Sequence, residues 1–356
     1  KDALQIKVII PDLLFINEEF NKDSLQTHEV ITESAYSNLK DDAEIQFVRL
    51  GYYRKESSHQ AIFSHKWVIM KIASIRKGEN ETYGLVQDDK IATKDDITYA
   101  TGVPIPINVR DFLFDGWLEE IKANYSKISF NHDLSEFDIL APLPNPQKIV
   151  CLAFNYIDHA KEQELTPPSE PAIFIKPRTT LCGTNSNITC PRFVKELDYE
   201  VELAVIIGKK CKNVSDEEAF NQIFGYMILN DVSARDIQFQ DKQFTRGKSF
   251  DTFAPCGPWI TTKDEIDEPQ NLRLMTNINK EERQNSNTKN MHLKIPQIIS
   301  KLSKVMTLEP GDIISTGTPE GVALKNPDTP FLKDGDKIHM EIEKLGTIKN
   351  TVKFID

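Results

Sequence analysis

The sequence predicts a mixed α+β fold in which β-strands predominate. Short runs of apolar and β-branched residues, separated by Gly, Pro, Asn and Asp, recur along the chain and are typical of strands. Residues 108–125 instead show apolar side chains at helical spacing. No glycine-rich phosphate loop follows a strand, and this excludes a dinucleotide-binding domain of the doubly wound class.

Composition and charge are typical of a soluble globular protein. Of the 356 residues, 39% are apolar and 27% are charged, and the formal net charge is −11. This acidic balance disfavours nucleic acid or an anionic membrane as the main partner. No apolar run reaches the roughly 18 residues that a membrane span needs. The five cysteines form no C-x-x-C pair, so we expect free thiols in a reducing compartment.

Residues 1–45 form an acidic N-terminal extension that matches no pattern we recognise. Glu18-Glu19 and Asp41-Asp42 are part of its acidic content. The segment is acidic and poor in Arg, unlike a mitochondrial transit peptide. Its first residue is Lys1 rather than Met, which is compatible with a processed start. We interpret the extension as a solvated, partly ordered tail, or as an arm that docks on a partner protein or on its own domain.

Residues 46–143 are predicted to form a small N-terminal β-rich domain. Residues 47–50, 67–72 and 83–86 read as strands joined by polar turns, and the helical spacing of residues 108–125 follows them. The proline-rich run 141–146 interrupts regular structure and makes a natural linker. We therefore place a second domain at residues 144–356. The small domain shows no cluster of chemically reactive side chains, and its expected role is structural.

A candidate metal site lies in the stretch Leu197–Gly208. Its second half is apolar and β-branched, as in a buried strand, and the strand period of two places Asp198, Glu200 and Glu202 on one face. Three like charges running into a buried segment repel one another and lose hydration. A hard cation such as Mg²⁺ would offset both costs. The alternative is a solvated strand end whose carboxylates contact water.

A candidate acid–base pair follows the strand predicted at residues 148–153. If residues 155–163 are helical, His159 and Glu162 lie three positions apart and face each other. A carboxylate beside an imidazole raises its basicity and fixes its tautomer, which suits a general base. A surface histidine with a helical neighbour is the simpler alternative.

Six motifs occur in the order found in the fumarylacetoacetate hydrolase superfamily, and the chain resembles that superfamily over residues 148–356. The resemblance is closest to the fumarylacetoacetate hydrolase domain-containing proteins, and residues 47–143 are more loosely similar to their small N-terminal domain. The motifs are Asn155-Tyr156-x-Asp158-His159-x-x-Glu162, Glu170-Pro171-x-x-Phe174-x-Lys176-Pro177, residues 198–208, residues 230–236, residues 247–253, and Gly311-Asp312-Ile313-Ile314-x-Thr316-Gly317-Thr318-Pro319-x-Gly321-Val322.

The resemblance implies a mixed β-roll with a metal site in its mouth, and a homodimer. It implies that Glu200, Glu202 and Asp231 bind Mg²⁺, with Mn²⁺ or Ca²⁺ as alternatives. Asp198 matches no ligand position, so we interpret it as a surface carboxylate or a support for the ligands.

Catalytic and substrate-binding roles follow from the same resemblance. The catalytic residues it implies are His159, Glu162 and Lys248. The substrate contacts it implies are Gln238, Thr318 and Lys176, although Lys176 equally suits a structural ion pair. We expect a further structural ion pair between Arg235 and Asp236.

The implied function is a metal-dependent enzyme that acts on small 2-keto acids, of the acylpyruvate or oxaloacetate type, through a metal-stabilised enolate. Hydrolytic C–C cleavage, decarboxylation and keto–enol tautomerisation all remain open. The alternative is a non-catalytic accessory subunit of a larger assembly, which the acidic extension favours and the intact set of site residues disfavours. For its location we expect the mitochondrial matrix, with the cytoplasm as the alternative.

Overall fold

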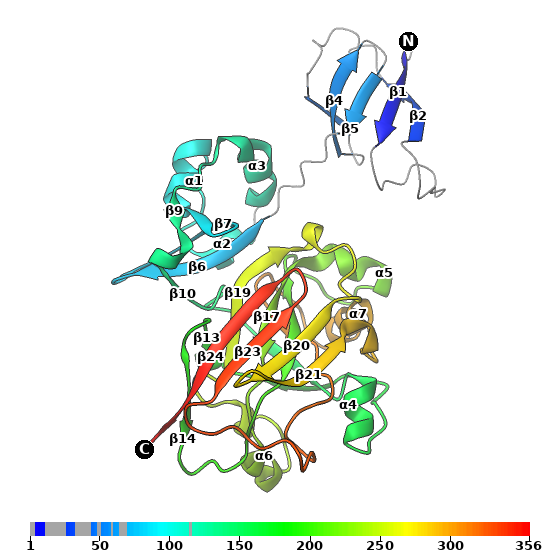
Figure 1. Cartoon of the computed structure of the whole chain (residues 1–356). Helices are drawn as coiled ribbons and strands as arrows, with labels where there is room; N and C mark the ends of the chain where they lie inside the picture. Colours follow the sequence, from blue (N-terminus) through cyan, green and yellow to red (C-terminus); the bar gives the residue numbers. More distant parts are fainter. Residues whose placement is uncertain are drawn as a thin grey trace. The chain divides into compact units, whose positions relative to one another are not determined.

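The structure is a computed structural model that forms two compact units, Lys1–Val68 and Ile69–Asp356 (Figure 1). In the first unit it describes the backbone of five strands within residues 4–63. In the second it describes residues 70–113 and 116–356 with their side chains.

The first unit contains a five-stranded sheet in the order β2-β1-β5-β4-β3. Two of its strands, β1 and β2, lie wholly within residues 1–45, the predicted acidic extension, whose role remains a prediction. Leu4, Ile6, Val8 and Ile10 alternate with other residues along β1, a period typical of a strand. The strands are β1 (Leu4–Ile10), β2 (Gln26–Thr32), β3 (Glu44–Phe47), β4 (Gly51–Ser57) and β5 (Gln60–Phe63).

The second unit is built on a twelve-stranded mixed sheet. Its central strands, β16 and β17, are buried along their whole length, as expected for runs of Val, Ile and Leu covered on both faces. In spatial order the sheet contains β12 (Ala172–Ile175), β11 (Ile149–Ala153), β22 (Ile313–Ser315), β16 (Val201–Ile207), β17 (Ile223–Asn230), β19 (Ala254–Thr262), β6 (Lys71–Lys77), β7 (Asn80–Gln87), β8 (Lys90–Thr93) and β9 (His132–Asp133), while β10 (Asp138–Ile139) pairs with β6 and β13 (Leu181–Cys182) pairs with β19.

The strand predicted at residues 83–86 is confirmed within β7. Of the other two, residues 47–50 overlap β3 only at Phe47, and residues 67–72 overlap β6 at Lys71 and Ile72; residues 48–50 and 67–69 lie outside the described residues. The helix predicted over residues 108–125 is two helices, α2 (Val109–Phe112) and α3 (Trp117–Asn124). Gly116, at the start of α3, has φ +70°, a left-handed conformation that no α-helix continues through. The other helix of this region is α1 (Lys94–Thr101).

Strands from the predicted small domain share the large sheet. β6 pairs with β19 in the antiparallel sense through Ile72 and Ile260. The division of the chain at residues 45 and 143 remains a prediction about domain organisation.

A second sheet and a few short helices complete this unit (Figure 1). The amphipathic helix α7 (Ile295–Val305) contributes four buried apolar side chains to the same core as β16 and β17. This second sheet has five strands in the order β14 (Asn187–Pro191), β24 (Gly346–Ile355), β23 (Lys337–Ile342), β20 (Arg273–Ile278) and β21 (Glu281–Asn287). A two-stranded ladder pairs β15 (Leu197–Asp198) with β18 (Ser233–Ala234). The other α-helices of the unit are α4 (Ile157–Glu162), α5 (Asp216–Ala219) and α6 (Arg235–Asp241).

Mixed sheets with few helices confirm the predicted α+β class. All five cysteines are free thiols, as expected from their spacing. Within the described residues, no helix combines the length and apolar character that crossing a membrane would require.

Candidate active site

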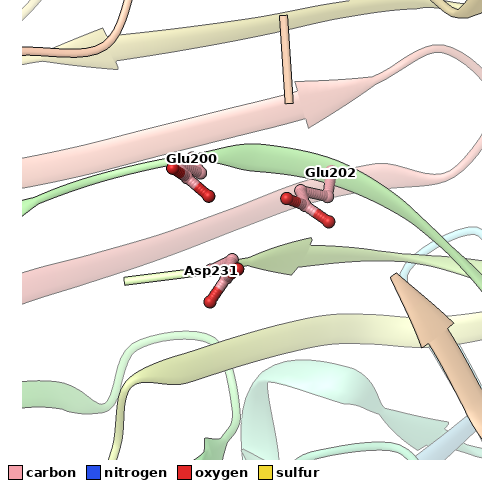
Figure 2. A group of neighbouring side chains, drawn as sticks. All are labelled: Glu200, Glu202 and Asp231. Atoms are coloured by element: carbon pink, nitrogen blue, oxygen red, sulfur yellow. The ribbon is translucent and has the colours of Figure 1, made fainter. Parts of the chain in front are cut away.

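The candidate site begins where β16 starts and β17 ends. The two strands are antiparallel with Val201 opposite Asn230, so the residues flanking that pair lie side by side. The backbone N–H of Asp231, just after β17, donates to the carbonyl of Glu200 at 2.9 Å. The carboxylates of Glu200, Glu202 and Asp231 are buried and have oxygens within 4.8 Å of one another; Figure 2 shows these side chains as neighbours.

The stretch that the sequence suggests as one strand is interrupted before β16. β15 ends at Asp198 and pairs with β18, while the N–H of Glu200 donates to the side-chain oxygen of Asn230 at 3.0 Å. The break carries Asp198 into the interior, where it is 0% exposed. Its carboxylate accepts from the N–H groups of Ala323 and Leu324 at 2.9 and 3.1 Å. Asp198 is therefore a buried supporting carboxylate and not a surface residue.

Arg235 connects the buried Asp198 to the cluster of three carboxylates through Glu200. Its guanidinium donates to Asp198 at 2.9 Å and to Glu200 at 2.6 Å. The predicted ion pair of Arg235 with Asp236 is wrong, because Asp236 accepts instead from the N–H of Lys195. Arg235 also lines the cavity described below. The sequence motif contains Arg235, but only the fold shows that it contacts a predicted ligand.

Lys248 lies between two of the three carboxylates. Its ammonium donates to Glu200 at 2.8 Å and to Asp231 at 2.7 Å. Burial lowers the pKa of Lys248, but the charges of Asp231 and Glu200 outweigh burial and raise it, so the ammonium is retained. Burial likewise raises the pKa of Glu200, but Lys248 and Arg235 outweigh it and hold that pKa at about 2.

Lys176 lies behind Asp231. Its ammonium is fully buried and donates to the Asp231 carboxylate at 2.5 Å and to the Val232 carbonyl at 3.3 Å. It is not among the residues that line the cavity. The structure thus places Lys176 as the ion-pair partner of Asp231, one of the two alternatives that the sequence left open.

Glu202 differs from its neighbours because no cation pairs with it among the described residues. It accepts from the Ser315 hydroxyl at 2.6 Å and from the Gly317 N–H at 2.9 Å, both neutral donors. Burial, followed by the charges of Asp231 and Glu200, raises the pKa of Glu202 well above its usual value. A buried carboxylate without a counter-ion is the arrangement that a bound cation would stabilise.

A hard divalent cation fits this donor set. Mg²⁺ and Mn²⁺ favour carboxylate oxygens, and two oxygens on opposite sides of one Mg²⁺ lie about 4 Å apart. The separation of up to 4.8 Å in the structure is close to this value. Glu200, Glu202 and Asp231 would hold such an ion.

The predicted His159–Glu162 pair is formed on α4. Nδ1 of His159 lies 3.1 Å from a Glu162 oxygen, and the other oxygen of Glu162 accepts from the N–H of Gly321 at 3.0 Å. His159 is buried at 5% exposure, with the ring of Phe154 stacked beside it. Asp158 accepts from the side chains of Ser286 and Asn290, which ties α4 to the region of β21. The histidine is therefore held from several sides and is not a free surface residue.

A cavity of about 130 Å³ brings these groups together. The carboxylates of Glu200 and Glu202, the cations of Arg235 and Lys248, and His159 form its polar wall. Its apolar wall is made by Leu152, Phe154, Leu165, Phe174, Phe239, Phe244 and Leu324.

Gln238 and Thr318, the two remaining predicted substrate contacts, also line the cavity. The Thr318 hydroxyl already donates to the Val201 carbonyl at 3.0 Å and accepts from Gln284 at 2.9 Å. Gln238 accepts from Arg235 at 3.2 Å. Both side chains are thus held in place by the protein.

We expect Gly321→Ala to destabilise the protein by about 2–4 kcal/mol. Gly321 has φ +98°, and an added Cβ would lie 2.0 Å from the carbonyl oxygen of Arg283. The backbone must shift, and that shift would also disturb the N–H that holds Glu162. Chemical denaturation of the variant measures the effect.

Gly335→Ala is the matched control. Gly335 has φ +85°, but nothing lies within 4 Å of its added Cβ, so only the conformational cost of about 1 kcal/mol applies. Equal losses for the two variants would contradict the predicted clash at Gly321.

Family models match both ends of the chain. Residues 148–353 match the model described as fumarylacetoacetate (FAA) hydrolase C-terminal. Residues 2–56, which include most of the acidic extension, match the family model described as tRNA synthetases class I (E and Q), anti-codon binding domain.

Curated relatives and solved structures resemble a large part of the chain. Oxaloacetate tautomerase fahd2, mitochondrial, from Xenopus laevis is 43% identical over 252 residues, 70% of this chain and 79% of its own. Oxaloacetate tautomerase YisK from Bacillus subtilis is 44% identical over 235 residues, 65% of this chain and 78% of its own. Among solved structures, the chain is similar to the crystal structure of maleylpyruvate hydrolase from Sphingobium sp. SYK-6 in complex with manganese (II) ion and pyruvate. The two chains share 33% sequence identity with a TM-score of 0.67, and the match covers 81% of this chain and 100% of the hydrolase chain.

Proposed function

The chain belongs to the fumarylacetoacetate hydrolase family, and from this premise we propose that it is a divalent-metal-dependent enzyme that catalyses the keto–enol tautomerisation of oxaloacetate. The observation that carries the proposal is a small cavity lined by His159 of the acid–base pair, by two of the three clustered carboxylates and by the cations of Arg235, Lys248 and Lys325. The named activity of two relatives, in Xenopus laevis and Bacillus subtilis, supports oxaloacetate as substrate.

The size of the cavity supports a small substrate. Its volume of about 130 Å³ is well below the roughly 300–1,000 Å³ of sites that enclose drug-sized ligands. A four-carbon acid suits this space.

The chemistry of the polar wall suits a 2-keto acid. A divalent cation held by Glu200, Glu202 and Asp231 would act as a Lewis acid toward the carboxylate and keto oxygens of such a substrate. The ammonium of Lys248 would offset the negative charge that develops as the substrate enolises. Mg²⁺ is the ion we propose, with Mn²⁺ or Ca²⁺ as alternatives.

His159 can move the proton at carbon 3. When its Nδ1–H donates to the Glu162 carboxylate, the lone pair of Nε2 is available, and Nε2 has no hydrogen-bond partner among the described residues. From the keto form, the imidazole would take a proton from carbon 3 while the oxygen on carbon 2 gains one to give the enol; in the reverse direction the imidazolium would return a proton to carbon 3 as that oxygen loses its own. Glu162 stabilises the imidazolium formed in between. Tautomerisation needs no other reactant.

Hydrolysis of an acylpyruvate is the second candidate, and the similarity to maleylpyruvate hydrolase favours it. It additionally requires a water held beside His159. The aromatic wall formed by Phe154, Phe174 and Phe244 limits the room for water, which supports tautomerisation over cleavage.

An accessory, non-catalytic subunit remains the alternative from another class. The presence of all three proposed metal ligands, of Lys248 and of the His159–Glu162 pair disfavours it.

We further propose that the protein forms a homodimer, that it has no nucleic-acid partner, and that residues 1–45 bind a partner protein. The mitochondrial names of relatives support a location in the mitochondrial matrix, with the cytoplasm as the alternative.

One assay separates these functions. The purified chain with Mg²⁺ is mixed with oxaloacetate or acetylpyruvate, and loss of enol, formation of pyruvate and release of carbon dioxide are followed separately, with EDTA as control. We expect accelerated enol–keto exchange of oxaloacetate alone. Pyruvate from acetylpyruvate would indicate a hydrolase, and carbon dioxide from oxaloacetate a decarboxylase. No turnover despite metal binding would favour the accessory role.

A further inference from the structure

We propose that Lys325 selects substrates with a second carboxylate, at the end of the cavity away from the candidate metal ligands. This inference rests on the proposed function, because it takes a 2-keto acid bound at those ligands as its starting point. Lys325 lies outside the six family motifs, the last of which ends at Val322.

Burial divides the cavity into a floor and a mouth. Glu200, Glu202 and Lys248 are at most 5% exposed and form the floor. Lys325 is exposed, as are Leu165 and Phe239, and these residues form the mouth. A substrate whose keto-acid end lies on the floor directs its other end toward the mouth.

Within the part of the chain that the structure describes, Lys325 is the cavity cation without a carboxylate partner. Of the described residues that line the cavity, Arg235, Lys248 and Lys325 carry a permanent positive charge. Arg235 is paired with Asp198 and Glu200, and Lys248 with Glu200 and Asp231. The ammonium of Lys325 donates to a neutral acceptor, the Gln163 carbonyl, at 2.9 Å.

The backbone around Lys325 is held in position. The Gln163 side-chain amide donates to the carbonyl of Leu324 at 3.2 Å, and the N–H of Leu324 donates to Asp198 at 3.1 Å. Lys325 itself has φ +59°, a left-handed conformation that is uncommon for residues other than glycine. The neighbouring bonds therefore fix where this side chain begins.

A second carboxylate would be a stronger acceptor than the one Lys325 now uses. The Gln163 carbonyl is a neutral acceptor, whereas a carboxylate adds the attraction between opposite charges to the hydrogen bond. The side chain would exchange the Gln163 carbonyl for the substrate, and Gln163 would keep its own bond to Leu324. A substrate that ends in a methyl or an ester group offers no such gain.

The first test compares oxaloacetate with its 4-methyl ester, which keeps the keto-acid end and loses the second charge. We expect Lys325→Gln to raise KM for oxaloacetate roughly 10–100-fold with little change in kcat, and to leave KM for the ester nearly unchanged. Lys325→Arg should restore most of the preference for oxaloacetate. Lys161→Gln removes an exposed lysine of α4 that does not line the cavity, and it should behave as the wild type.

The second test does not depend on turnover. Isothermal titration calorimetry with Mg²⁺ present compares malate with 2-hydroxybutanoate, which has a methyl group in place of the second carboxylate. We expect the wild type to bind malate at least about 10-fold more tightly, and Lys325→Gln to lose that preference.

The two tests separate failure of the inference from failure of the proposed function. An inactive protein whose malate preference depends on Lys325 would refute tautomerisation and support the inference. An active enzyme whose preference survives Lys325→Gln would overturn the inference alone. An equal loss of affinity for malate and 2-hydroxybutanoate would also overturn it, because it would assign Lys325 a structural role.

Discussion

Glu202→Ala is expected to abolish divalent-metal binding. The variant removes one of three buried carboxylates, and it is the one without a protein cation beside it. We expect at least about a 100-fold loss of Mg²⁺ affinity. The stabilisation that a saturating metal confers, about 2.7 kcal/mol at 100 times Kd, should disappear with it. Calorimetric titration and melting curves with and without EDTA measure both effects.

Glu341→Ala is the matched control for this prediction, because Glu341 is an exposed glutamate of β23. It should bind metal as the wild type does. Normal Mg²⁺ binding by Glu202→Ala would refute the ligand assignment.

Glu202→Gln tests the same site without metal. Because the folded protein raises the pKa of Glu202 above 4.5, folding favours its protonated form. The resulting stability is fully present below the unfolded pKa and is lost as pH rises through the folded pKa. Glutamine resembles the protonated acid, so in EDTA the variant should gain melting temperature relative to wild type as the pH rises above the unfolded pKa and through the higher folded pKa. A difference that does not vary with pH would contradict an unpaired buried charge.

His159→Ala is expected to lose turnover and keep metal binding. Among the described residues that line the cavity, His159 is the histidine, and Glu162 supplies a carboxylate that orients its ring for proton transfer. General acid–base catalysis contributes roughly 10²–10⁴-fold, and we expect kcat to fall by this factor. Enol–keto exchange measures turnover, and calorimetric titration measures Mg²⁺ affinity.

Two further variants serve as comparisons for His159→Ala. Glu162→Gln should lower kcat by less, because His159 remains but loses the carboxylate that stabilises its charged form. His339→Ala, on β23 and away from the cavity, should leave kcat unchanged. Full activity in His159→Ala would show that the pair has no role in the proton transfer.

Much of the candidate site could be predicted from local spacing. Glu200 and Glu202 are two residues apart, and His159 and Glu162 are three apart on a short helix, so each pair is close for reasons of backbone geometry alone. The family membership inferred from the ordered motifs is confirmed by the match to residues 148–353.

Local sequence spacing could not predict the hydrogen bonds and ion pairs between residues that are far apart in the chain. The spacing of Arg235 within its own segment gives no sign of its hydrogen bond to Asp198, which lies 37 residues earlier in the chain. Likewise, Asp198 reads as part of one continuous strand, yet the break at Tyr199 and Glu200 buries it behind the cavity. The sequence predicted an ion pair for Arg235 but with the wrong partner, and it left open whether Asp198 is a surface carboxylate or a support for the ligands.

The amino-acid order specified the elements that short-range sterics and hydrophobic periodicity control: the buried strand after Glu200, the strand at residues 83–86 and the helix that carries His159. The tertiary structure decided which charges meet. The register of β16 against β17 brings Asp231 to Glu200, and the return of residues 321–325 over β15 brings Lys325 to the cavity mouth. The reason is physical: a charged side chain has no preferred partner within its own segment, and its surroundings arise only when long-range strand pairing excludes water around it.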